Sequence, residues 1–151
     1  MNYLGELRKL VGHRPLLMVG ATVLVLDKDN RLLLLKRSDN KYWGPPGGAI
    51  ELGETVEETA RREVFEETGL KIVDSSLFKV FSGKEQYYRY PNGDEVYIVA
   101  IVYICKEFSG EIQLSSEHTE WGWFALSELP DEISPPVKPI IEEFEQISFD
   151  I

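Results

Sequence analysis

The stretch from residue 48 to residue 70, GAIELGETVEETARREVFEETGL, constrains this chain more than any other part of its sequence. Its 23 residues include seven glutamates and two arginines, so they carry half of the chain's formal net charge of −10. Carboxylates gathered this closely repel one another. The chain must therefore either hold them in solvent or bring them around a cation.

The order of residues in this stretch predicts a helix that begins near Thr55. Thr55 and Glu58 have the T-x-x-E spacing of a capping box, and Gly69 suits the position just after a helix end. An apolar residue recurs every four positions, at Val56, Ala60 and Val64. A stripe at this spacing lies on one face of a helix, so we expect that face to pack against a β-sheet.

Three of the glutamates fall beside that apolar stripe. At roughly 100° per residue, Glu63, Glu66 and Glu67 share one arc of about 100° at its border. Each like-charge pair costs a few tenths of a kcal/mol on an open helix, and the negative end of the helix dipole adds to that cost. A hard divalent cation such as Mg²⁺ or Mn²⁺ would reverse these terms. The alternative is a solvated helix face on which Arg61 and Arg62 partner the carboxylates.

A longer pattern favours the cation. With U an aliphatic residue, the pattern G-x5-E-x7-R-E-U-x-E-E-x-G-U is matched by Gly48, Glu54, Arg62, Glu63, Val64, Glu66, Glu67, Gly69 and Leu70. A chance match is on the order of 10⁻⁹ per starting position. The stretch resembles the signature of the Nudix hydrolases, with the Nudix box at 48–70. The lead-in WGPPGG and the later segment WGWFALSELP extend this resemblance over most of the chain.

The resemblance implies an α/β/α sandwich that hydrolyses a pyrophosphate bond in a nucleoside diphosphate linked to another moiety, with Mg²⁺ or Mn²⁺ as cofactor. Glu66 and Glu67 match the metal-binding pair of that family. Glu63 matches a metal ligand or the base that orients water, and Arg62 is expected to orient a glutamate rather than to contact substrate. Gly47 and Gly48 match the point where a main-chain carbonyl reaches the metal, which a residue without Cβ permits.

Other polar residues have more local roles in this interpretation. Glu54 is expected to support the junction between the loop and the helix. Many relatives supply a further carboxylate from a loop ahead of the last strand, and here we prefer Glu117 to Glu120 as the metal ligand. His118 as a general base is an alternative, but we expect His118 and His13 to be surface loop histidines.

The segment GKEQYYRYPNGDEVY is the candidate for reading the substrate. Lys84 and Arg89 are candidates to contact phosphate, and Tyr88, with Tyr87 and Tyr90, is a candidate to stack on a base. Aromatic residues are also ordinary in β-strands, so a purely structural role is the alternative.

The remaining segments mix strands and helices without regular βαβ alternation. The expected helices lie at 2–11 and around 137–144, the expected strands at 16–26, 31–37, 71–82, 85–90, 95–106, 111–114 and 121–126, and a loop at 38–48. This order favours an α+β fold, with helices packed on a mixed β-sheet in one domain spanning 1–151.

Charge and cysteine content limit the partners and the compartment. An acidic chain repels phosphate backbones and anionic lipids, so we expect neither long nucleic acid nor a membrane as partner. The resemblance implies a small-molecule nucleotide as ligand instead. Cys105 is the single cysteine and is expected in the core, which leaves no internal disulfide. The apolar run at 16–26 is too short to span a bilayer. We therefore expect a cytoplasmic protein, either a monomer or a homodimer.

The leading hypothesis is a Mg²⁺-dependent pyrophosphohydrolase acting on a nucleotide, a nucleotide sugar, an ADP-ribose-like compound or a nucleoside triphosphate. One alternative is a catalytically silent Nudix-like module that binds a nucleotide as a sensor, and another is an acidic interaction domain. Magnesium-dependent turnover separates these three hypotheses.

Overall fold

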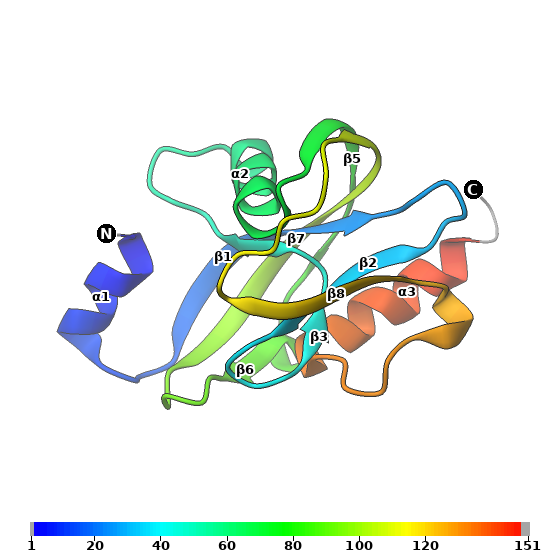
Figure 1. Ribbon diagram of the computed structural model, residues 1–151. Coiled ribbons are helices and arrows are strands. Elements are labelled where there is room, and N and C mark those ends of the chain that lie inside the picture. The colour runs from blue at the N-terminus through cyan, green and yellow to red at the C-terminus, as the bar shows by residue number, and fades with distance from the viewer. Residues whose placement is uncertain (1, 149–151) are drawn as a thin grey trace.

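The computed structural model describes residues 2–148 and consists of two β-sheets flanked by helices (Figure 1). The α-helices are α1 (Tyr3–Val11), α2 (Val56–Thr68) and α3 (Lys138–Ser148). The strands are β1 (Leu16–Val25), β2 (Leu32–Arg37), β3 (Trp43–Gly44), β4 (Gly47–Ala49), β5 (Lys71–Phe81), β6 (Tyr87–Arg89), β7 (Glu95–Ser109) and β8 (His118–Phe124). Short 3₁₀ helices are η1 (Lys84–Gln86), η2 (Leu126–Glu128) and η3 (Pro135–Val137).

The larger sheet is mixed. Its strand order is β4-β1-β7-β5, with β6 also paired to β7. Strands β1 and β7 run parallel along the whole of β1, whereas the other pairs in this sheet are antiparallel. The smaller sheet has the order β3-β2-β8 and is antiparallel. The expected α+β sandwich with a mixed sheet between helices is therefore confirmed, and the structure adds a second, antiparallel sheet.

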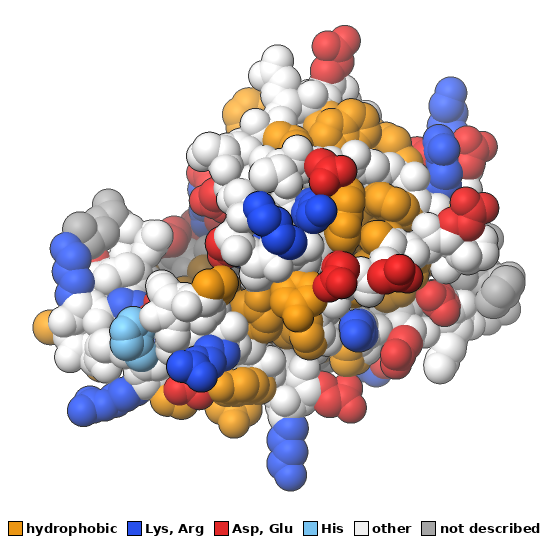
Figure 2. Space-filling model, turned by 60° about the horizontal axis from the view of Figure 1, so that its bottom comes forward, with side chains coloured by type: hydrophobic (Ala, Val, Ile, Leu, Met, Phe, Trp, Pro, Cys, Tyr) orange, Lys and Arg blue, Asp and Glu red, His pale blue; other side chains and the backbone are white. Residues whose placement is uncertain are grey.

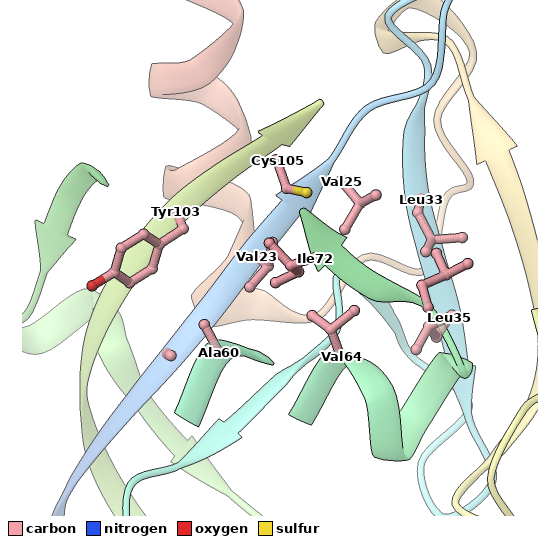
Figure 3. Close-up of a cluster of buried hydrophobic side chains, with 11 residues drawn as sticks. Val23, Val25, Leu33, Leu35, Ala60, Val64, Ile72, Tyr103 and Cys105 are labelled. Atoms are coloured by element: carbon pink, nitrogen blue, oxygen red, sulfur yellow. The ribbon is translucent and has the colours of Figure 1, made fainter. Parts of the chain in front are cut away.

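The core lies on both faces of β1, because successive side chains of a strand point to opposite sides. Val23 and Val25 pack with Ala60 and Val64 of α2 (Figure 3). Leu24, on the other face, belongs to the cluster that includes three residues of α3: Ile140, Ile141 and Phe144. Each fully buried Val or Leu side chain contributes roughly 1.5–3 kcal/mol. Helix α2 is thus held on a rigid base by the apolar stripe expected from the sequence.

Most expected elements are present. The capping box of Thr55 and Glu58 is formed, and Gly69 ends α2 in the left-handed conformation with φ 78°. The expected helix at 2–11 and strands at 16–26 and 31–37 agree with α1, β1 and β2 to within one residue at each end. Cys105 is fully buried, as expected.

Four segments differ from expectation. The predicted loop at 38–48 contains β3 and the start of β4, because Trp43 pairs with β2 and the glycine pair joins β1. The predicted strand at 111–114 is not one, since the main-chain N–H of Gln113 bonds the carbonyl of Thr68 at the end of α2. The strand expected at 85–90 is divided between η1 and β6, and the one expected at 121–126 begins earlier, at His118.

Helix α1 lies at one side of the molecule, beside the loop that leads to α2 (Figure 1). None of its residues is buried. Within residues 2–148, every helix is too short or too polar to cross a lipid bilayer.

Candidate active site

Arg62 connects the loop before α2 with the carboxylates on the helix. Its Nε and Nη2 atoms donate hydrogen bonds of 2.6 and 3.0 Å to the two carboxylate oxygens of Glu54. Its Nη1 atom donates to Glu63 at 2.8 Å and to Glu66 at 3.3 Å, and Nη2 also donates to the carbonyl of Ala49 at 3.1 Å. One planar guanidinium therefore orients two of the three clustered glutamates and fixes the loop in front of them.

Glu54 joins this loop to the helix, as expected from the sequence. Besides the bonds from Arg62, it accepts the main-chain N–H of Glu51 at 3.0 Å and the hydroxyl of Thr59 at 2.9 Å. Hydrogen bonds from the Arg62 side chain, the largest cause, lower the pKa of Glu54 from 4.5 to about 2. This carboxylate is thus a fixed anion committed to Arg62.

Glu67 lies at the bottom of the cluster, with only 7% of its surface exposed. The main-chain N–H of Gly47 donates a hydrogen bond of 2.9 Å to its Oε1. Burial, the largest cause, and the charges of Glu63 and Glu117 together raise the pKa of Glu67 to about 8, although the Gly47 N–H and the charge of Arg37 oppose this change. This carboxylate is held in place with little to neutralise it.

Glu63 is half-buried against Gly48 of β4. A Cβ atom on Gly48 would lie 2.4 Å from Cδ of Glu63, so that position admits glycine alone without displacing the carboxylate. Burial raises the pKa of Glu63, the ion pair with Arg62 opposes that change, and the charges of Glu66 and Glu117 add to it. The close approach of the glycine backbone thus defines one wall of the cluster.

A cavity of about 800 Å³ contains these groups. The expected site residues that line it are Gly47, Gly48, Arg62, Glu63, Glu66, Glu67 and Glu117. Strand β4 and helix α2 supply all but Glu117, which comes from the turn before β8. The fold therefore gathers in one place the residues that the sequence pattern singled out.

The donor chemistry of this cavity fits a hard divalent cation. Within residues 2–148, no three Asp, Glu, His or Cys side chains converge closely enough to hold a metal ion as they stand. However, Glu67 is buried, forms no ion pair with a described residue, and faces further carboxylates. A buried charge of this kind is costly unless a cation compensates it, and carboxylate oxygens are the ligands that Mg²⁺ and Mn²⁺ prefer.

Glu117 and Glu120, the two carboxylates considered as alternative metal ligands, lie in different places in the structure. Glu117 lines the cavity, whereas Glu120 lies in β8 and contacts Lys36 across the strands at 3.3 Å. His118 is not a surface loop histidine: it begins β8, is half-buried, and its Nδ1 is buried without a hydrogen-bond partner. Its pairing with Arg37 across β2 and β8 turns it inward. His13 is exposed, as expected, and contacts Asp94 at 2.7 Å.

The residues expected to recognise the substrate do not line a single cavity. Tyr88 lines a smaller cavity of about 140 Å³ that reaches Glu67 and Gly47. Lys84 is exposed in η1, and Arg89 lines another cavity of about 360 Å³, which Tyr88 also lines. Neither of these cations lines the carboxylate cavity.

Sequence reasoning missed Arg37 and gave Tyr90 no separate role. Both line the carboxylate cavity. Arg37 forms two hydrogen bonds of 2.9 and 2.8 Å with Asp39 and lies 5.7 Å from the centre of the Tyr90 ring. The signal was a pair of cations, Lys36 and Arg37, at the end of a buried apolar strand, LLLLKR, just before the glycine-rich loop.

Comparison with known proteins agrees with this geometry. Residues 16–144 match the family model described as the NUDIX domain. A MutT-like protein of Streptomyces ambofaciens is 38% identical over 120 residues, which cover 80% of this chain and 69% of that protein. An ADP-ribose pyrophosphatase of Methanocaldococcus jannaschii is 39% identical over 109 residues, which cover 70% of this chain but 61% of that protein.

Solved structures show the same fold. The crystal structure of a MutT NUDIX hydrolase from Burkholderia pseudomallei has a TM-score of 0.71 and 32% identity, covering 85% of this chain and 97% of that one. The chain therefore belongs to the Nudix family and is a hydrolase of that family.

Proposed function

We propose that this protein is a divalent-cation-dependent pyrophosphohydrolase that cleaves the phosphate anhydride of a small nucleoside diphosphate derivative. The observation that carries the proposal is Glu67, a buried carboxylate that faces Glu63 and Glu117 in an open cavity and forms no ion pair with a described residue. An arrangement that is costly for the protein alone is typical of a functional site.

We assign Glu63, Glu66, Glu67 and Glu117 as the carboxylates that would hold Mg²⁺ or Mn²⁺. Nudix hydrolases generally use a divalent metal, which lowers the pKa of a water molecule and neutralises phosphate charge when it is bound. The hydrogen bonds of Arg62 to Glu63 and Glu66 support its assignment as a positioning residue. The N–H of Gly47 keeps Glu67 turned toward the cavity in the same way.

The reaction adds water across one anhydride bond. The water oxygen forms a bond to phosphorus and gives up a proton to the solvent, the bond from phosphorus to the bridging oxygen breaks, and the departing phosphate takes that electron pair. Similar proteins support a small nucleotide as substrate, since three of them are named as an ADP-ribose pyrophosphatase, a putative 8-oxo-dGTP diphosphatase and a nucleoside triphosphatase.

A substrate panel tests this function. The purified protein is incubated with ADP-ribose, UDP-glucose, diadenosine tetraphosphate, ATP and dGTP, each with Mg²⁺, Mn²⁺ or EDTA, and nucleoside monophosphate is measured by chromatography. We expect monophosphate from at least one compound with either metal and none with EDTA. If calorimetry shows nucleotide binding while no compound is cleaved with either metal, the protein acts as a sensor and the proposal fails.

A further inference from the structure

A second cavity, of about 510 Å³, adjoins the carboxylate cavity on the side of α1. The two cavities share five lining residues: Asn2, Leu4, Met18, Arg37 and Tyr90. Two of these belong to the N-terminal segment, and the turn between β6 and β7 also lines the second cavity. In Figure 2 a hollow separates the lobe at the left, which carries the N-terminal segment, from the rest of the molecule. A ligand at the carboxylates can therefore extend into the second cavity.

Helix α1 is held over this cavity by polar contacts at both of its ends. At its start, the main-chain N–H of Tyr3 donates to Oε1 of Glu51 at 2.8 Å, in the loop that precedes α2. Farther along, Arg8 donates through Nη2 to the carbonyl of Glu95 at 2.6 Å and through Nη1 to that of Arg14 at 2.6 Å. Since no residue of α1 is buried, the helix adds little to the core. Its fixed position instead forms a wall of the second cavity.

The charges of the second cavity are balanced internally. Arg8 pairs with Asp94 at 3.6 Å, and Arg37 forms its two hydrogen bonds with Asp39. All four of these residues line the cavity. Each cation is therefore already matched by a carboxylate, and an added phosphate would meet an aspartate beside each arginine. Such a lining favours an uncharged ligand over an anion.

The remaining lining suits a polyhydroxy ring. Tyr90, Leu4 and Met18 supply aromatic and apolar surface on which the C–H face of a sugar can pack. Asp39 and Asp94 offer carboxylate oxygens that accept hydrogen bonds from hydroxyl groups. Apolar surface with a few polar groups is the usual composition of a small-molecule site.

We propose that this second cavity binds an uncharged group attached to the β-phosphate, a sugar or a nucleoside. The enzyme then prefers nucleoside diphosphates that carry such a group to nucleoside triphosphates. This inference rests on the proposed function, because the diphosphate must lie at the carboxylates for the attached group to reach the cavity.

The test compares ADP-ribose with ATP, which share adenosine diphosphate and differ in what the β-phosphate carries. Gly5 lines the second cavity and not the carboxylate cavity, so Gly5→Trp is designed to obstruct the former. Leu10→Trp adds the same ring on α1 at a side chain that is 83% exposed and serves as the matched control. Gly5→Leu is a smaller version should tryptophan disturb the helix.

For the wild type, we expect kcat/KM for ADP-ribose to exceed that for ATP by about 10-fold or more. Gly5→Trp is expected to lower kcat/KM for ADP-ribose by about 10-fold or more and to leave ATP within about threefold, which also shows that the variant is folded. Leu10→Trp is expected to change neither. Equal losses for both compounds, no loss for either, or a wild-type preference for ATP would overturn the inference.

Binding separates this inference from the proposed function. If the wild type cleaves neither compound, dissociation constants for ADP-ribose and ATP are measured by calorimetry for the wild type and Gly5→Trp. A selective weakening of ADP-ribose binding then supports the second cavity although the hydrolase proposal has failed. Unselective weakening, or no change, rejects the second cavity as well.

Discussion

The main-chain N–H of Gly47 lies 2.9 Å from Oε1 of Glu67, and through this bond β4 fixes a carboxylate that is almost completely buried. The bond favours the ionised form of Glu67 but is outweighed by burial, so the pKa stays near 8. In the absence of metal, the protein therefore holds this side chain at a cost. A single isosteric substitution, Glu67→Gln, removes this cost, so the role of the carboxylate can be tested directly.

Glu67→Gln is expected to abolish most turnover and yet stabilise the metal-free protein. Glutamine keeps an acceptor oxygen for Gly47 and removes the charge, so activity falls on the order of 100-fold or more. Because the folded pKa is raised from 4.5 to about 8, the wild type loses stability as pH rises through that window, and the variant does not. At pH 8 in EDTA the variant gains roughly 1–2 kcal/mol of unfolding free energy.

Urea unfolding in EDTA at pH 5 and pH 8 measures this difference. Glu120→Gln is the control, because Glu120 is exposed on β8 and should alter neither turnover nor the pH dependence. A Glu67→Gln protein that is less stable than the wild type at pH 8, or that retains full activity, contradicts the assignment.

Arg62→Lys is expected to lower kcat by about 10- to 100-fold with a smaller change in KM. A lysine has one point of charge and cannot reach Glu54, Glu63 and the carbonyl of Ala49 together, so the carboxylates lose their orientation while the cavity stays open. Steady-state kinetics on the best substrate give both constants. Arg61→Lys is the matched control, since Arg61 turns away to the carbonyl of Ile72 at 2.7 Å. A change confined to KM would instead indicate substrate contact by Arg62.

Glu54→Gln is expected to weaken the pH dependence of the unfolding free energy in the acid range. The pKa of Glu54 is lowered from 4.5 to about 2, so its ionised form stabilises the fold above pH 4.5, and this contribution is lost as pH falls toward 2. The variant should lose about 1–2 kcal/mol at pH 7 and much less at pH 2.5. Urea unfolding at both pH values measures the loss, with the exposed Glu85→Gln as control. An equal loss at both pH values would mean that packing, and not charge, is responsible.

The sequence pattern predicted the carboxylates of α2 better than the cavity residues that the strands supply, and the reason is physical. Glu63, Glu66 and Glu67 lie within two turns of one helix, so helical geometry alone brings them together. Arg37 and Tyr90 reach the same cavity only because β2 pairs with β8 and because β6 and β7 form a hairpin beside β1. Pairings between distant strands leave no periodic mark in the sequence.

The wrong strand at 111–114 has a related cause. Its alternating residues, EIQL, are typical of a strand, and Ile112 and Leu114 do pack on the core beside α2. However, the main-chain N–H groups of Gln113 and Ser115 bond the carbonyls of Thr68 and Glu67 at the end of the helix. Competition for hydrogen bonds with a distant segment decided the conformation, and local pattern does not reveal it.

Gly48→Ala is expected to reduce activity by about 100-fold while the protein still folds. The new Cβ would lie 2.4 Å from Cδ of Glu63, so the carboxylate must move, and a misplacement of this size is costly in catalysis. Gly44→Ala, in the same glycine-rich lead-in, is the matched control because its Cβ would meet only Cγ2 of Val137 at 3.6 Å, an ordinary contact. Kinetics and thermal unfolding of both variants are compared. Equal activities of the two would show that the position of Glu63 against β4 does not matter for turnover.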